Sequence, residues 1–295
     1  MRNAEPGYTF YERGIVNGER QRDFIDAGDA RPLGVIIYYL LSDRAGEVSL
    51  TILDAEGNEI RSFTGDAIPT ERFLSFDNRG YEQDLVTGRP KARVSKGLNR
   101  FIWDMRYPAV SRIPGLPPVV INPIAKPGTY QVRLTVDGQS QTESFEIEIN
   151  PNETYTRAET DEKAKTWMAL YATAEEGVQT VLDAQAAQKR VAEALESGGA
   201  SDALQAQAAV VDDLCQEFIS SMVATGTTLV QIISEPTKPL SMLVTLHNIQ
   251  EHTEGPPNQP WREVYAKVAG NMDEYMASFK GELAKEMARF EELAR

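Results

Sequence analysis

Residues 130–149 read YQVRLTVDGQSQTESFEIEI, and this stretch decides the fold class of the first half of the chain. Apolar side chains alternate with polar ones from Tyr130 to Val136 and again from Phe145 to Ile149, which is the period of a half-buried β-strand. Asp137-Gly138 lies between the two runs and suits a type I′ turn, in which both central residues have positive φ. The stretch therefore predicts an antiparallel β-hairpin.

Further strand-like segments lie upstream of this hairpin. Residues 48–52 and 59–64 flank a turn that contains a glycine, and they predict a second hairpin. Strands are also predicted at 35–41, at 97–106 and, more weakly, at 73–76. About seven short strands with no helical segment between them favour an antiparallel β-sandwich, which we place at residues 33–150.

Two long irregular stretches, at about 77–96 and 107–126, interrupt the predicted strands. The second contains five prolines, Pro108, Pro114, Pro117, Pro118 and Pro123, which block regular strand pairing. Loops of this length in a compact domain are usually functional or lie against a neighbour. We therefore expect them to cover a partner domain.

The hydrophobic period changes near Asn150-Pro151-Asn152, where we place the domain boundary. Beyond it, apolar residues recur every three or four positions, which predicts helices. The expected helices cover about 160–197, begin again at Ser201, and cover about 240–250 and 261–293, separated by glycines and prolines. Two starts are open for the first helix: Thr156 and Glu159 match a capping box, or Thr160 caps the helix with Asp161 and Glu162 placed against its dipole. These lengths fit a long antiparallel bundle of about four helices over residues 151–295.

Each long helix has a predicted inward face. The predicted inward residues are Trp167, Leu170, Ala174, Val178, Val181 and Ala184 in the first, Leu204, Ala208, Val211, Cys215, Phe218 and Met222 in the second, and Trp261, Val264, Val268, Met272, Tyr275, Phe279, Leu283, Met287 and Phe290 in the fourth.

The chain has 295 residues and a net charge of −14, which is unevenly divided. Residues 1–150 carry 18 Lys and Arg against 21 Asp and Glu, whereas residues 151–295 carry 12 against 23. An acidic surface repels phosphate backbones and anionic membranes, so we expect no nucleic-acid partner. The longest apolar run, residues 33–41, is about half of a membrane-spanning helix, and the first residues lack the apolar core of a signal peptide. We expect no membrane insertion.

Few side chains are candidates for a metal site. Cys215 is the only cysteine, which excludes intramolecular disulfides, and His247 and His252 are the only histidines. The two histidines are five positions apart, so they lie on different faces of a helix and make a poor metal pair. We expect Cys215 to be buried and inert. No serine or cysteine nucleophile lies in a recognisable elbow.

Acidic side chains offer two further candidates. Asp77, Glu82 and Asp84 share one loop, where oxygen ligands could hold Ca²⁺, although their spacing fits no EF-hand and a solvated loop is favoured. Asp104 is the best-placed strand acid for glycoside hydrolysis, which needs two carboxyl groups across a cleft. The favoured alternative is that Asp104 closes a strand and bonds the backbone or Arg100.

Four aromatic residues, Tyr38, Tyr39, Trp103 and Tyr107, could form a platform on which a sugar ring stacks. Alternating aromatics in a sandwich normally form its core, and this is the interpretation we favour for Trp103. We therefore predict no catalytic, cofactor-binding or metal-binding residues in this chain.

Three segments carry a resemblance to a known family: Gly57, Ile60 and Arg61; residues 97–108, GLNRFIWDMRYP; and residues 127–138, PGTYQVRLTVDG. In this order they resemble the C-terminal region of large bacterial BNR-repeat, sortilin-like proteins described as glycosyl hydrolases. The resemblance runs from about residue 32 to the end of the chain, and the helical part matches less specifically. It implies an Ig-like sandwich similar to the module of the flagellar hook-capping protein.

The chain departs from this family at its beginning. In the family a β-propeller precedes this region, with the repeated Asp-box S-x-D-x-G-x-[ST]-W. The nearest string here, residues 75–80 (SFDNRG), has its glycine one place late and no tryptophan. Residues 1–31 cannot encode a complete four-stranded blade, so we interpret residues 1–32 as a connector or remnant of a preceding propeller.

The resemblance implies a non-catalytic accessory module that braces or docks a β-propeller, with no cofactor, in a periplasmic or extracellular setting. Two alternatives remain. One is a carbohydrate-binding accessory module, which would expose at least two aromatic rings. The other is part of an exported glycosyl hydrolase whose catalytic residues lie in a missing propeller, which would turn the acids of the 77–84 loop toward a cleft. An apolar patch on the 108–127 loop would favour docking.

Overall fold

The computed structural model describes residues 10–16, 19–24, 34–66, 75–76, 82–83, 91–116, 119–149, 155–196, 201–224, 238–253 and 255–294. The chain divides into two compact units. The β unit comprises residues 1–107 and 125–154, and the helical unit comprises residues 108–124 and 155–295. The predicted boundary at residues 150–152 lies outside the described residues.

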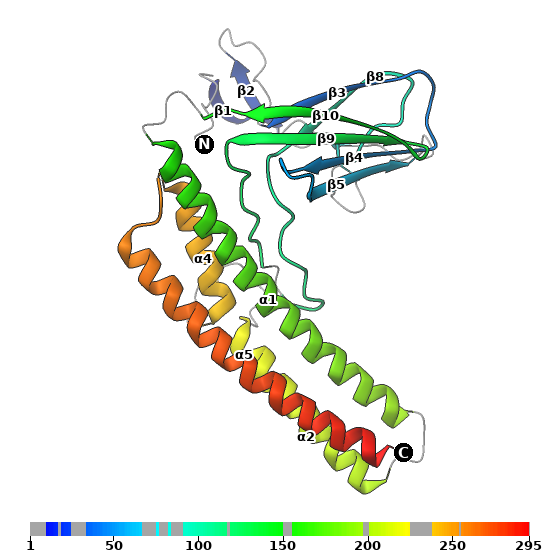
Figure 1. The fold of residues 1–295 in the computed structure, drawn as a ribbon, viewed down its shortest axis with the longest axis vertical. Helices are drawn as coiled ribbons and strands as arrows, with labels where there is room; N and C mark the ends of the chain where they lie inside the picture. The colour runs from blue at the N-terminus through cyan, green and yellow to red at the C-terminus, as the bar shows by residue number, and fades with distance from the viewer. Residues whose placement is uncertain are drawn as a thin grey trace. The chain divides into compact units, whose positions relative to one another are not determined.

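The β unit is built from two antiparallel sheets (Figure 1). The first has the order β10-β9-β4-β5 and comprises β4 (Glu47–Leu53), β5 (Glu59–Asp66), β9 (Gly128–Val136) and β10 (Gln139–Ile147). The second pairs β3 (Val35–Leu41) with β8 (Gly97–Trp103). The predicted β region followed by an α region is confirmed, and so are both predicted hairpins.

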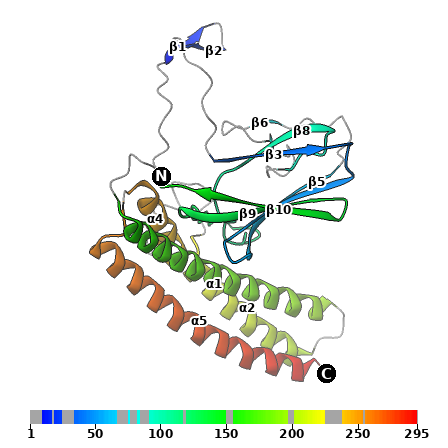
Figure 2. The same ribbon diagram turned by 45° about the horizontal axis from the view of Figure 1, so that its top comes forward.

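Side chains from both sheets meet in one core. Its largest fully buried member in this unit is Trp103, with no exposed surface, and the indole contacts the rings of Tyr130 and Phe145 edge-on at 5.8 and 6.2 Å. β4 contributes Val48, Leu50 and Ile52. Figure 2 shows β3 and β8 as one layer and β9 and β10 as part of the other. In β4, fully buried side chains recur at every second residue from Val48 to Ile52, as the alternation of apolar and polar residues in the sequence predicts.

The turn between β9 and β10 has the predicted type. Asp137 and Gly138 have φ values of 46° and 85°, and Val136 pairs with Gln139 across them, which is the geometry of a two-residue type I′ turn. The Asp137 carboxylate also accepts hydrogen bonds from the backbone N–H of Gly46 at 3.1 Å and of Glu47 at 2.9 Å. These bonds fasten the turn to the start of β4.

Two further strand pairs lie outside these sheets. β1 (Phe10–Val16) pairs with β2 (Glu19–Phe24), and β6 (Ser75–Phe76) pairs with β7 (Glu82–Gln83). Residues 1–32 were expected to be a connector, and the hairpin of β1 and β2 was not predicted. Asn17-Gly18, between these strands, is the sequence signal that indicates such a hairpin.

The helical unit contains α1 (Arg157–Glu196), α2 (Asp202–Met222), α4 (Pro239–His252) and α5 (Gln259–Leu293). About four helices were predicted, and this is confirmed. The capping box before α1 is present, because Glu159 accepts from Thr156 N–H at 2.8 Å and the Thr156 hydroxyl accepts from Glu159 N–H at 3.3 Å. The backbone N–H of Thr156 lowers the pKa of Glu159. Ser201 caps α2 as expected.

The direction of the helices differs from a simple antiparallel bundle. α1 and α5 run parallel, as ion pairs near both ends show: Arg262 with Glu162 at 2.9 Å and Arg190 with Glu291 at 2.7 Å. α2 and α4 both run against them, α4 beside the first half of α1 and α2 beside the second half (Figure 1). The two middle helices therefore form one interrupted antiparallel partner, which the sequence pattern did not indicate.

The predicted inward faces of α1 and α2 are confirmed, because all twelve of those side chains are buried. Two assignments in α5 were wrong, since Val264 is 42% and Tyr275 39% exposed. Met276, four positions after Met272, is buried in place of Tyr275. Tyr275 instead stacks its ring against Phe218 at 5.3 Å.

An extended segment, Pro108–Ile124, completes the helical core. Its buried side chains are Val110, Ile113, Val119 and Ile121. Ser111 donates from its backbone N–H and its hydroxyl to the two carboxylate oxygens of Glu175, at 2.8 and 2.6 Å, and Gln185 donates to the carbonyl of Pro114 at 3.1 Å. Two irregular stretches were expected to cover a partner domain. The described residues of 108–124 do pack in the helical core, whereas most of the other stretch, 77–96, lies outside the described residues.

Candidate functional site

The four aromatic residues proposed as a sugar platform do not share a surface. Trp103 is fully buried and donates from Nε1 to the carbonyl of Arg106 at 3.2 Å. Tyr39 is buried and donates to the carbonyl of Arg93 at 2.7 Å, and burial raises its pKa to about 12. Tyr107 is half-buried, and Tyr38 alone of the four is exposed. Trp103 is therefore a core residue.

Asp104 occupies a structural position. Its Oδ1 accepts from the backbone N–H of Arg106 at 3.1 Å and from the guanidinium of Arg61 at 3.4 Å. The favoured interpretation, a strand-closing aspartate bonded to backbone, is confirmed. The arginine partner that the structure shows is Arg61 on β5, because β5 and β8 face each other across the two sheets, where the rings of Phe63 and Phe101 are also in contact.

The predicted calcium candidates cannot be assembled into a site. Asp77 and Asp84 lie outside the described residues. Glu82 is described only through its strand pairing with Phe76. Over the part of the chain that the structure describes, no three His, Cys, Asp or Glu side chains are grouped so as to hold a metal ion.

The two histidines lie in different environments. His247 is buried in α4, and its Nδ1 accepts a hydrogen bond of 2.6 Å from Nε1 of Trp167 in α1. The accepting Nδ1 places the proton of the neutral ring on Nε2, 3.6 Å from the Glu251 carboxylate. His252 is exposed. The Trp167–His247 pair, which joins two helices, was not predicted, because the residues are 80 positions apart.

Cys215 is buried on the inward face of α2. Burial, with a smaller effect from Asp212, raises the pKa of its thiol to about 11. The predicted burial of Cys215 is confirmed, and because the thiolate is the nucleophilic form of cysteine, the raised pKa supports the predicted inert role.

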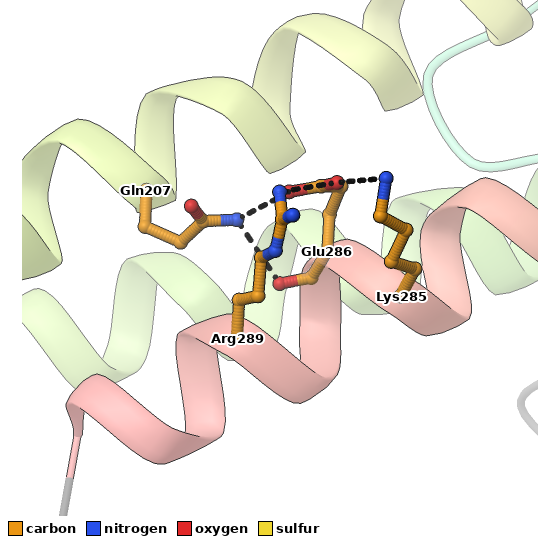
Figure 3. Close-up of polar contacts among 4 residues, drawn as sticks. All are labelled: Gln207, Lys285, Glu286 and Arg289. Carbon is orange, nitrogen blue, oxygen red and sulfur yellow. Dashed lines mark hydrogen bonds and ion pairs between the residues drawn. The ribbon is translucent and has the colours of Figure 1, made fainter.

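Glu286 on α5 is the buried acid that the sequence did not reveal (Figure 3). Its carboxylate accepts from the amide of Gln207 on α2 at 2.9 Å and from the guanidinium of Arg289 at 3.0 and 3.1 Å. The Gln207 hydrogen bond, followed by Arg289 and Lys285, holds the pKa of Glu286 below its ordinary value. Because both oxygens are engaged, this carboxylate joins α2 to α5 and is a poor candidate for proton transfer.

The outer face of β3 and β8 carries large apolar side chains in solvent. Tyr38, Leu40 and Leu98 are 59%, 72% and 71% exposed, and Leu40 pairs directly with Leu98 across the two strands. We call these three residues the outer apolar face. The sequence signal is the uninterrupted apolar run at residues 35–41, VIIYYLL, which places apolar side chains on both faces of the strand. In a strand with one solvated face, apolar and polar residues alternate.

A groove of about 420 Å³ lies beside this face, within the β unit. It is lined by residues 40–45, which end β3 and follow it, and by Leu134, Val136, Asp137 and residues 139–141 around the β9–β10 turn. Leu134 and Val136 are half-buried, and their cross-strand partners are Gln141 and Gln139. The groove thus has apolar side chains on β9 and amide side chains on β10, and its lining also includes the charged residues Asp43, Arg44 and Asp137.

Neither a known family nor a curated protein sequence matches the chain. Within its described residues, the structure has no helix that is both long and apolar enough to span a membrane.

Proposed function

We propose that this chain is a non-catalytic interaction module that docks a partner protein through the outer apolar face. The observation that carries the proposal is the exposure of Tyr38, Leu40 and Leu98 on one face of a two-stranded sheet. Soluble proteins rarely leave several large apolar side chains adjacent in water unless another surface covers them. Arg100 pairs with Tyr38 and is exposed beside it, and tyrosine and arginine are enriched in protein interfaces.

The nature of the partner follows from the resemblance of residues 32–295 to sortilin-like BNR-repeat proteins. On this proposal the β unit is an Ig-like sandwich, the partner is a β-propeller domain or subunit, and the setting is periplasmic or extracellular. The support is topological: hairpins β4–β5 and β9–β10 join through the β4–β9 pairing, with β3 and β8 sharing their core. Ig-like sandwiches combine such sheets around a buried tryptophan.

A titration tests the docking surface. The purified chain is titrated with a purified β-propeller of the sortilin-like BNR-repeat class by isothermal titration calorimetry. We expect saturable binding that Leu98→Lys weakens by about tenfold or more, because a charge replaces an apolar contact at the centre of the interface. Val210→Lys on α2 is the matched control, since Val210 is also exposed, at 47%.

Equal binding by the wild type and Leu98→Lys would contradict the assignment of the surface. Absence of binding to any propeller of this class would contradict the partner. Retention of the wild-type chain on a polysaccharide, lost in Leu98→Lys, would instead favour the carbohydrate-binding alternative.

A further inference from the structure

The two layers of the β unit have unequal widths. Four strands form one layer, and the described residues place two strands, β3 and β8, in the other. A sandwich buries its inner faces only where both layers are present. Part of the inner face of the wider sheet therefore has no strand opposite it among the described residues.

Side-chain contacts show where the narrower layer stops. β8 lies over β5, because the rings of Phe101 and Phe63 are 4.6 Å apart and Asp104 pairs with Arg61. The end of β3 instead shares the groove with β9 and β10. The uncovered region is thus the space beside β3, above the last residues of β9 and the first residues of β10.

The chemistry of the groove differs from that of a closed core. Leu134 and Val136 form its apolar part and are half-buried, whereas Val48, Leu50 and Ile52 on neighbouring β4 are fully buried. Gln139 and Gln141, on the same face of β10, are exposed. The Gln141 amide donates to the Glu143 carboxylate at 3.4 Å, and an amide side chain has donors and acceptors that can also bond the backbone of a bound segment.

β3 is suited to pair on its second edge. Among the described residues β8 alone pairs with β3, and in an antiparallel pair every second residue directs its N–H and C=O away from the partner. Residues 35–41 contain no charge and no proline, the devices by which exposed edge strands avoid further pairing.

We propose that this edge and the groove accept a single extended segment of another protein, which adds as a strand to β3. Alternate apolar side chains of the segment enter the groove onto Leu134 and Val136, and the intervening side chains cover Tyr38 and Leu40 on the outer apolar face. The site is continuous with the docking face, so this inference rests on the proposed function and specifies the form of the partner. Backbone hydrogen bonds supply affinity and the groove selects side chains.

The space beside β3 is wide enough for one added strand but not for a second folded copy of this chain. The wider sheet extends past β3 by the part of β9 and β10 that lines the groove. A second copy presenting its own β3 edge would bring its own β9–β10 hairpin into the same space. A single segment meets no such obstacle.

Residue-resolved amide hydrogen exchange by NMR tests the open edge on the full chain. In the free protein we expect protection to alternate along β3, with amides directed to β8 exchanging slowly and the intervening amides exchanging fast. Uniform slow exchange over residues 35–41, equal to that of β4, would show that the chain already covers its own edge and would overturn the proposal.

The same measurement with an added probe tests strand addition. The probe is a seven-residue peptide of alternating valine and threonine, and its control has proline at the central position, which cannot complete the strand pairing. We expect the valine–threonine peptide to slow the fast-exchanging amides of β3 by about tenfold or more at millimolar concentration, and the proline peptide to leave them unchanged.

Two variants locate the peptide. Gln141→Trp fills the groove and should abolish the peptide effect, whereas Thr142→Trp, on the opposite face of exposed β10, should preserve it. No peptide effect on the wild type, or an equal effect on both variants, would overturn the proposal. The proposal would also be overturned if the free chain sediments as a dimer and Leu40→Lys dissociates that dimer, because the β3 edges of two copies would then pair with each other. If the chain binds the propeller but shows no effect of the peptide, the docking function holds and only the proposed strand site is contradicted.

Discussion

In the helical unit, Ile113 and Ile121 of an extended segment fill the core beside α1, whereas in the β unit the layer of β3 and β8 faces four strands and leaves a groove. On the proposal above, the β unit accepts a piece of extended chain from a partner, whereas the helical unit already contains one, residues 108–124. The helical unit obtains it from residues between β8 and β9. The difference teaches that a segment outside helices and sheets serves as a core element when several of its apolar side chains, here Val110, Ile113, Val119 and Ile121, are buried against the helices.

The largest expected effect comes from removing the segment that completes the helical core. Replacing Val110, Ile113, Val119 and Ile121 together by serine removes four buried side chains, a loss on the order of 10 kcal/mol, comparable to the whole stability of a domain. We expect loss of the cooperative helical transition in thermal unfolding followed by far-ultraviolet circular dichroism. Val120→Ser is the control, because Val120 is 50% exposed. An unchanged melting temperature in the fourfold variant would show that the helices form a core alone.

The second prediction concerns the core of the β unit. Trp103→Ala removes an indole with no exposed surface, and such truncations cost about 3–5 kcal/mol. We expect the β unit to unfold at lower urea concentration, measured by near-ultraviolet circular dichroism. Leu98→Ala, at a position 71% exposed, should stay within about 0.5 kcal/mol of wild type. Equal effects of the two substitutions would contradict the placement of Trp103 in the core.

A smaller effect is expected where a polar contact joins helices. Trp167→Phe removes the indole N–H that His247 Nδ1 accepts, and leaves a buried acceptor without its donor. Such a loss costs about 1–3 kcal/mol. The measurement is urea unfolding at neutral pH, with Trp261→Phe as a comparison that removes the hydrogen bond to the Leu246 carbonyl. No change in the unfolding midpoint of Trp167→Phe would contradict a stabilising role of the pair.

The smallest effect concerns Glu286 and depends on pH. Gln207 and Arg289 lower its pKa in the folded protein, so its stabilising contribution is present above the unfolded value of about 4.3 and is lost as pH falls through the folded pKa. Glu286→Gln should therefore lower the urea midpoint at neutral pH, and the difference from wild type should shrink in acid. Glu282→Gln, at an exposed position one turn earlier, is the control. A difference that grows in acid would contradict this sign.

The sequence by itself determined the local features. The alternation of Tyr130, Val132 and Leu134 identified β9, and the Asp137-Gly138 pair identified its turn. The start of α1 was narrowed to two candidates, of which the structure shows Thr156 with Glu159. These features depend on residues a few positions apart, whose backbone preferences and side-chain periods act within one element. The burial of Trp103 followed from the same alternation.

Only the tertiary structure decided which elements meet. The parallel course of α1 and α5 brings Arg190 to Glu291, and the pairing of Gln207 with Glu286 joins residues 79 positions apart. The groove likewise combines residues 40–45 with residues 134–141. The spacing of residues in the sequence does not predict these contacts between distant segments. The free energy that favours them comes from burying apolar surface between those segments, and the buried area depends on how the whole unit packs.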